Sequence, residues 1–161
     1  MDPSRFAARR MTRTYRQTIN AIPEKVFPLL CPVREAEWLD GWRYTMIYSE
    51  SGLMEKGAVF STPHDGEADT VWIVTKHDPE TREIEFTRFT PGSRICVLRI
   101  AVSAKAGTSS FVDISYTYTA TTSAGNAFIE SLTEAAFVEA VGFWEKSMNF
   151  FLDTGKKLIT A

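Results

Sequence analysis

Apolar and polar positions alternate along the middle of the chain. Between residues 110 and 122, one polar residue separates each successive pair among Val112, Ile114, Tyr116 and Tyr118. A period of two is typical of a β-strand with one buried face and one solvated face. Residues 94–104 and 83–90 repeat the alternation, and in the second of these segments Arg88 is in phase with the apolar positions. The pattern predicts a sheet whose inner face needs a cover.

Turn-forming residues divide the chain into short segments. A first strand is expected at residues 11–20, and six more at 43–49, 58–62, 70–77, 83–90, 94–104 and 110–122. Because the connections between these six strands are short, neighbouring strands should be antiparallel. After the first strand, Pro23 begins a short helix that Pro32 ends, and residues 34–39 form a second helical turn.

Residues 125–158 contain no proline, and their polar side chains gather on one arc of a helical projection. This pattern predicts one long amphipathic helix that covers the sheet. The centre of its apolar stripe is small, with Thr133, Ala136, Ala140 and Ser147. Small residues there indicate either close packing against the sheet or the roof of a hollow.

The predicted fold class is therefore α+β. A curved antiparallel sheet of about seven strands would wrap around the long C-terminal helix, with two short helices after the first strand. No linker or repeat divides the chain, so residues 1–161 are expected to form a single domain. Residues 1–10 would form a flexible arm. Five arginines between residues 5 and 16 favour a solvated arm leading into an edge strand, with a contact for an anionic partner as the alternative.

Composition narrows the classes of function. The net charge of -2 and the pI of about 5.7 argue against nucleic-acid binding, which depends on a basic surface. Cys31 and Cys96 are far apart and are expected to be small buried residues. His64 and His77 have no metal-ligand spacing, so neither a metal nor a cofactor is expected. The absence of a membrane span or signal segment predicts a cytoplasmic protein.

Several segments resemble a known superfamily. They are residues 31–42 (CPVREAEWLDGW), 59–62 (VFST), 71–74 (VWIV) and 116–119 (YTYT), the last leading into Gly125 and Asn126. Together with the element order, they resemble the START-related helix-grip superfamily, also called SRPBCC or polyketide cyclase/dehydrase-like, and within it a bacterial subfamily without an assigned reaction. The resemblance covers roughly residues 12–158. It implies a pocket under the long helix for sterols, lipids, polyketides or hormones and, in some members, cyclisation of aromatic rings.

Candidate site residues follow from the predicted faces. The expected ligand-binding set is Glu35, Trp38, Trp42, Trp72, Phe86, Arg88, Tyr116, Tyr118, Phe128 and Phe143. Glu35 is the one weak catalytic candidate, as an acid or base beside indole rings, and the alternative is a structural ion pair. Arg88 should meet Glu35, Glu37, Glu139 or an anionic ligand group, unless it reaches solvent along its stem.

The sequence thus predicts a protein that binds a small apolar or amphipathic molecule, lipid- or polyketide-like, between sheet and helix. One alternative is a cyclase or dehydratase that acts on a polyketide-like substrate through a pocket carboxylate. Another is a protein-interaction module without a ligand, and a homodimer is a candidate assembly. Association with nucleic acid or insertion into a membrane is not expected.

Overall fold

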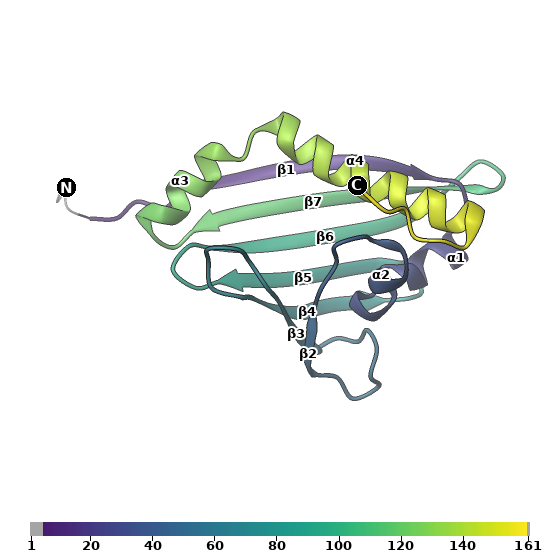
Figure 1. Ribbon diagram of the computed structural model, residues 1–161, viewed down its shortest axis with the longest axis horizontal. Coiled ribbons are helices and arrows are strands. Elements are labelled where there is room, and N and C mark those ends of the chain that lie inside the picture. The colour runs from purple at the N-terminus through teal and green to yellow at the C-terminus, as the bar shows by residue number, and fades with distance from the viewer. Residues whose placement is uncertain (1–4, 161) are drawn as a thin grey trace.

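The alternating segments form one antiparallel sheet. The computed structural model describes residues 5–160 and places the strands in the order β1-β7-β6-β5-β4-β3-β2 (Figure 1). Their bounds are β1 Arg10–Ile19, β2 Thr45–Tyr48, β3 Val59–Thr62, β4 Thr70–Asp78, β5 Glu83–Thr90, β6 Arg94–Lys105 and β7 Ser109–Ala120. The predicted seven-stranded antiparallel sheet is confirmed.

The register of the strands aligns the inner face in rows. Arg88 lies opposite Trp72 on β4 and Cys96 on β6, and Cys96 lies opposite Tyr118 on β7. Because alternate residues share a face, the neighbouring inner row contains Phe86, Leu98 and Tyr116. The predicted inward phase of Arg88 is therefore confirmed.

Two prolines start the short helices after β1. Helix α1 (Pro23–Val26) continues into the 3₁₀ turn η1 (Phe27–Leu29), and α2 (Pro32–Trp38) follows. Pro32 was expected to end the first helix. It also occupies the first turn of α2, where its missing N–H group costs no hydrogen bond.

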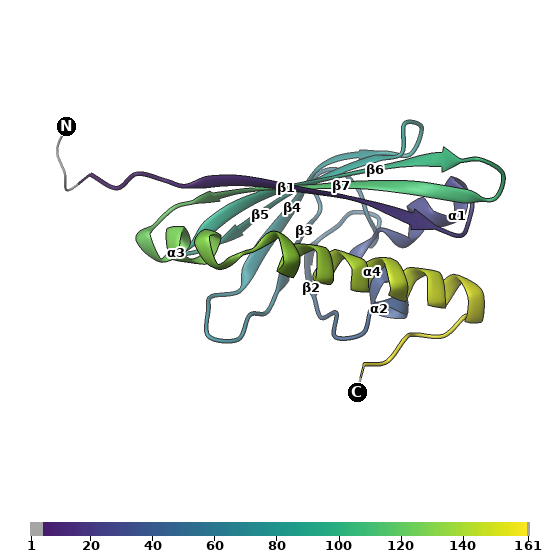
Figure 2. The same cartoon turned by 90° about the horizontal axis from the view of Figure 1, so that it is seen from above.

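The prediction of one helix over residues 125–158 is wrong. The chain forms α3 (Ser123–Ser131) and α4 (Glu134–Thr154), which lie on the same side of the sheet (Figure 2). At the break, the Thr133 hydroxyl accepts a hydrogen bond of 3.1 Å from the backbone N–H of Ala136. Arg13 donates to the carbonyl of Leu132 at 3.1 Å. A capping threonine followed by an acidic residue is a helix start, and here this local signal outweighs the continuous amphipathic pattern.

The side chains on the buried face of α4 are larger than predicted. This face consists of Phe137, Val141, Trp144, Ser147 and Met148. Of the small residues expected at its centre, Thr133 and Ala136 are exposed and only Ser147 is fully buried. The buried face of α4 is therefore centred on large side chains that neighbour the predicted small ones.

Helix α4 is also hydrogen-bonded to the edge of the sheet. Glu145 accepts from the backbone N–H of Thr18 at 2.6 Å and from the hydroxyl of Tyr15 at 2.8 Å. Asn149 accepts from the backbone N–H of Asn20 at 2.8 Å and donates to the carbonyl of Thr18 at 3.0 Å. The side chains of α4 thus satisfy unpaired backbone groups of β1 and of Asn20, the residue that follows it.

The predicted N-terminal arm lies partly outside the described residues, which begin at residue 5. The backbone N–H of Arg9 donates to Asn126 at 2.8 Å, and Asn126 donates to the carbonyl of Ala7 at 3.0 Å. The Arg9 guanidinium pairs with Glu130. These contacts join the start of β1 to α3. Across residues 5–160, no helix has both the length and the apolar character required to cross a bilayer.

Candidate functional site

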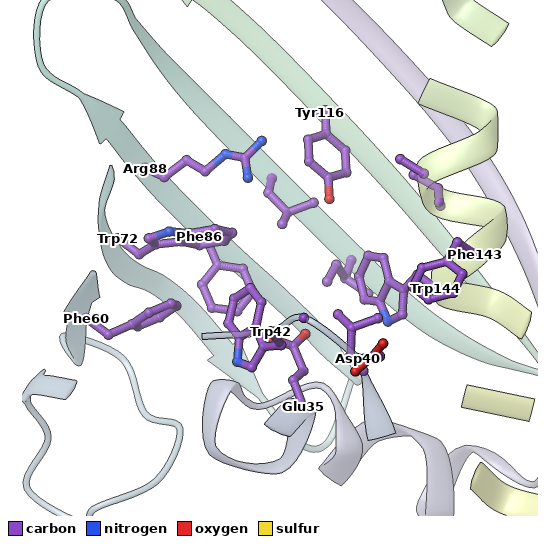
Figure 3. Close-up of a pocket in the computed structure, with 16 residues that line it drawn as sticks. Glu35, Asp40, Trp42, Phe60, Trp72, Phe86, Arg88, Tyr116, Phe143 and Trp144 are labelled. Atoms are coloured by element: carbon purple, nitrogen blue, oxygen red, sulfur yellow. The ribbon is translucent and has the colours of Figure 1, made fainter. Parts of the chain in front are cut away.

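A cavity of about 310 Å³ lies between the inner face of the sheet, α2 and α4 (Figure 3). The predicted site residues that line it are Glu35, Trp42, Trp72, Phe86, Arg88, Tyr116 and Phe143. They come from α2, the turn after it, three strands and α4, so the fold brings together side chains that are far apart in sequence. Phe60, Leu98 and Trp144 also line the cavity but were not predicted to do so. For Leu98 the signal was present, because it shares the inward phase of its strand.

Aromatic rings form one rigid side of the cavity. Trp72 stacks on Phe60 with 5.2 Å between ring centroids and meets Phe86 edge-on at 5.4 Å. The indole N–H of Trp72 donates to Thr62 at 3.0 Å, which fixes the orientation of the ring. Trp42 closes this side at 6.1 Å from Trp72. A wall held in this way is pre-formed for a flat apolar ligand.

Arg88 reaches the cavity without a carboxylate partner. Its guanidinium carbon lies 4.8 Å from the ring centroid of Trp72 and 5.1 Å from that of Tyr116, and one nitrogen donates to the hydroxyl of Tyr118 at 3.1 Å. Within the described part of the chain, no ion pair includes Arg88.

The predicted carboxylate partners of Arg88 are therefore wrong. Glu37 pairs with Arg34 on its own helix, and Glu139 is exposed on α4. Glu35 lines the same cavity as Arg88 but enters it from α2, on the opposite side (Figure 3). Aromatic faces stabilise the guanidinium in place of an anion, at a smaller gain in energy.

Glu35 is a carboxyl group deep in the molecule. Burial raises its pKa from 4.5 to about 8, and neither a hydrogen bond nor a counter-charge offsets this shift. The group is therefore protonated at neutral pH. Glu35 and Arg88 keep some accessible area although protein surrounds them, as expected for groups that face an internal cavity.

Two further polar groups belong to the cavity wall. Burial raises the pKa of Tyr116, so its hydroxyl stays protonated, and the hydroxyl points into the cavity (Figure 3). The indole N–H of Trp144 has no hydrogen-bond partner among residues 5–160. At neutral pH these groups can all donate hydrogen bonds into the cavity.

Asp40 is the acidic group at the rim of the cavity. Its carboxylate accepts from the backbone N–H of Thr160 at 3.1 Å and from the Thr160 hydroxyl at 2.9 Å. These bonds hold the pKa of Asp40 below its ordinary value and occupy the carboxylate with the C-terminal segment.

The other predicted site residues lie outside this lining. Trp38 is fully buried, stacks on Trp144 at 6.3 Å and donates to the carbonyl of Leu29 at 3.1 Å, so it supports the wall from behind. Tyr118 packs beside Arg88 in a smaller cluster. Phe128 belongs to α3 and contacts Arg94, with 3.4 Å between the guanidinium carbon and the ring centroid.

A second hollow of about 390 Å³ adjoins the cavity at Arg88. It is more polar, and its lining includes His64, Thr70, Thr90 and Arg94. Arg94 is buried and contacts Glu67 through two distances of 3.2 Å. Arg88 therefore stands between an apolar cavity and a polar hollow.

The remaining chemistry-bearing residues have structural surroundings. His77 stacks on Phe27 at 5.4 Å, and burial lowers its pKa. Cys31 and Cys96 are free and buried, which confirms the prediction made for them. No group of three or more metal-ligating side chains occurs in residues 5–160.

Comparisons with known proteins yield structural matches only. No family model and no curated protein matches the sequence. Norcoclaurine synthase from Thalictrum flavum in complex with dopamine and hydroxybenzaldehyde superposes with a TM-score of 0.68 at 13% identity, over 92% of this chain and 90% of that one. A hypothetical protein from Helicobacter pylori reaches a TM-score of 0.71 at 7% identity, over 88% and 87%. The predicted helix-grip fold is thereby confirmed for this chain.

Proposed function

We propose that the protein binds a small apolar or amphipathic molecule, lipid- or polyketide-like, in the cavity between the sheet and α4. The observation that carries this proposal is a cavity of about 310 Å³ with an aromatic wall and few polar groups. Sites for small molecules are usually concave, mostly apolar and largely pre-formed. The norcoclaurine synthase of the same fold, solved with two small aromatic molecules, supports the proposal.

A neutral fluorescent probe tests binding. Phenylnaphthylamine should bind saturably, and Leu98→Trp, which places an indole in the cavity, should weaken its affinity at least about tenfold. Val97→Trp is the matched control, because Val97 is the neighbouring residue of β6 and points to the outer face. Equal binding by the two variants would place the probe outside the cavity and remove support for the proposal.

Native mass spectrometry supplies an independent measurement. We expect freshly purified protein to carry a co-purified molecule, or to form a one-to-one complex with the probe. A ligand selective for the folded state also raises the midpoint of thermal unfolding.

A second candidate function is proton transfer to or from a bound carbonyl compound, as in a cyclase or dehydratase. The observation that favours it is Glu35, because a general acid or base acts best with a pKa near the working pH. Arg88 would stabilise negative charge on the substrate oxygen. Glu35→Gln should then abolish turnover of a polyketide-like substrate and leave its binding intact, whereas loss of both would indicate a binding role.

An interaction module without a ligand is less well supported. Such a module needs no internal cavity, and packing of the sheet against α4 would be expected to fill the space. The open cavity argues against it.

A further inference from the structure

Arg88 is the cation of the cavity, and the chain surrounds it with groups that carry no charge. Its neighbours are the rings of Trp72 and Tyr116 and the hydroxyl of Tyr118. A guanidinium stays protonated in proteins, so the charge cannot be removed by loss of a proton. A charge held away from water is costly unless it is paired. The position therefore lacks an anion that would offset the cost.

The acidic groups nearest to the cavity do not supply that anion. Glu35 lines the opposite side and is neutral at neutral pH. Asp40 is held at the rim by Thr160. Glu67, in the adjoining hollow, is engaged by Arg94.

The other polar groups of the wall favour the same kind of ligand. The hydroxyl of Tyr116 points into the cavity (Figure 3), and the indole N–H of Trp144 is a hydrogen-bond donor without a partner in the described residues. A cavity with one positive charge and several donors is complementary to a molecule rich in acceptor oxygens. Its aromatic wall is complementary to a ring system.

We propose that the ligand of this cavity is an organic acid with an aromatic or other flat apolar body, and that Arg88 holds its anionic group. This inference rests on the proposed binding function and specifies the class of ligand. The body packs against Trp72, Phe86 and Trp42, and the anionic group lies at the junction with the polar hollow. A guanidinium can bind a carboxylate or sulfonate through two parallel hydrogen bonds.

Two probes with the same ring skeleton isolate the contribution of the anion. Anilinonaphthalene sulfonate differs from phenylnaphthylamine by its sulfonate group alone. The quantity to compare is the ratio of their dissociation constants at neutral pH, in the parent protein and in Arg88→Met. We expect the preference for the sulfonate to fall at least about tenfold in Arg88→Met, the range for a hydrogen bond to a charged group. Binding of phenylnaphthylamine should change less than about twofold, because it has no anion to lose.

Arg99→Met is the matched control for net charge. Arg99 is exposed on β6, where it pairs with Glu85 on the outer face. This variant should keep the full preference for the sulfonate. An equal fall in Arg88→Met and Arg99→Met would show a nonspecific charge effect and overturn the inference.

The possible outcomes separate the inference from the function on which it rests. If phenylnaphthylamine binds in the cavity but Arg88→Met leaves the preference unchanged, the organic-acid inference is wrong and the binding function stands. If neither probe binds the parent protein, both fail. If Arg88→Met does not fold, Arg88→Gln keeps a polar tip for Tyr118 and is judged by the same criterion.

Discussion

Two combinations of arginine and glutamate lie on the helix side of the sheet, and they differ in whether the charges touch. Arg94 and Glu67 are in contact at 3.2 Å, beneath the ring of Phe128. Arg88 and Glu35 line the same cavity but form no ion pair. The first combination is neutralised by contact. In the second, the carboxyl keeps its proton and the guanidinium lies against rings.

The difference indicates a division of roles. A paired charge contributes to the stability of the fold, and its hydrogen-bonding groups are not available to a ligand. An unpaired arginine and a neutral carboxyl contribute little to stability, and they remain available to a molecule that enters the cavity. Three predictions on folding stability test this comparison, and the binding experiments above test its functional side.

The largest effect is expected for Glu35→Gln at alkaline pH. Between about pH 4.5 and 8 the folded protein holds a proton that the unfolded chain releases, so the free energy of unfolding falls as pH rises. Glu35→Gln has no such proton to hold, so its free energy of unfolding does not fall for this reason. It should match the parent near pH 4.5 and exceed it on the order of 4 kcal/mol at pH 9, as measured by urea denaturation. The charged or titratable groups that face Glu35 across the cavity are Arg88, Tyr116 and Asp40, and all are unchanged in the variant.

Glu37→Gln is the control for this pH effect, because Glu37 is exposed on the same helix and pairs with Arg34. Its difference from the parent should not grow between pH 4.5 and pH 9. If the difference in the free energy of unfolding between Glu35→Gln and the parent is also independent of pH, the Glu35 carboxyl is not neutral at neutral pH.

A smaller loss of stability is expected when the ion pair of Arg94 and Glu67 is broken. Glu67→Ala leaves Arg94 buried without a carboxylate. Because the Glu67 side chain is 35% exposed, the loss should be about 2 kcal/mol, between the values for buried and exposed pairs. Chemical denaturation at neutral pH measures the change. Glu83→Ala breaks the exposed pair with Lys76 and should cost less than about 1 kcal/mol. Equal effects of the two variants would contradict a structural role for Arg94 and Glu67.

The smallest effect on folding is expected at Arg88. Arg88→Met replaces an unpaired guanidinium with an apolar chain, so the free energy of unfolding should change by less than about 1 kcal/mol or increase slightly. The same measurement as for Glu67→Ala applies. A loss as large as that of Glu67→Ala would mean that Arg88 has a structural partner, and the contrast between the two combinations would fail.

The centre of the sheet was predictable from the sequence because apolar and polar residues alternate in β5, β6 and β7. The phase of residues 83–90 was enough to place Arg88 inside, and that of residues 110–118 did the same for Tyr116. The break at Leu132 was missed because Thr133 was counted among the small residues of one continuous apolar stripe. Only the local capping signal distinguishes two helices from one.

The cavity itself was only partly predictable. Its wall combines residues from α2, five strands and α4, and their distances depend on the curvature of the sheet, which no local pattern encodes. Phe128 was assigned to the wall on the assumption of a continuous helix, but it belongs to α3 and meets Arg94 instead. Arg88 was expected to meet a carboxylate or an anionic ligand group, unless it reached solvent. The carboxylate alternative was wrong, because aromatic rings occupy the neighbouring positions.

The hydrogen bonds from Glu145 and Asn149 to β1 have a consequence for how the cavity can open. Helix α4 covers the cavity, and its side chains also form hydrogen bonds with backbone groups at Thr18 and Asn20, at the end of the edge strand β1. If α4 moved away from the sheet, these backbone groups would lose their partners, and the exposed edge strand could pair with a strand of another chain. We therefore expect α4 to stay in place and molecules to enter the cavity from the side of α2 and the loops. Glu145 and Asn149 would then determine both the route of entry and the resistance of this edge to aggregation.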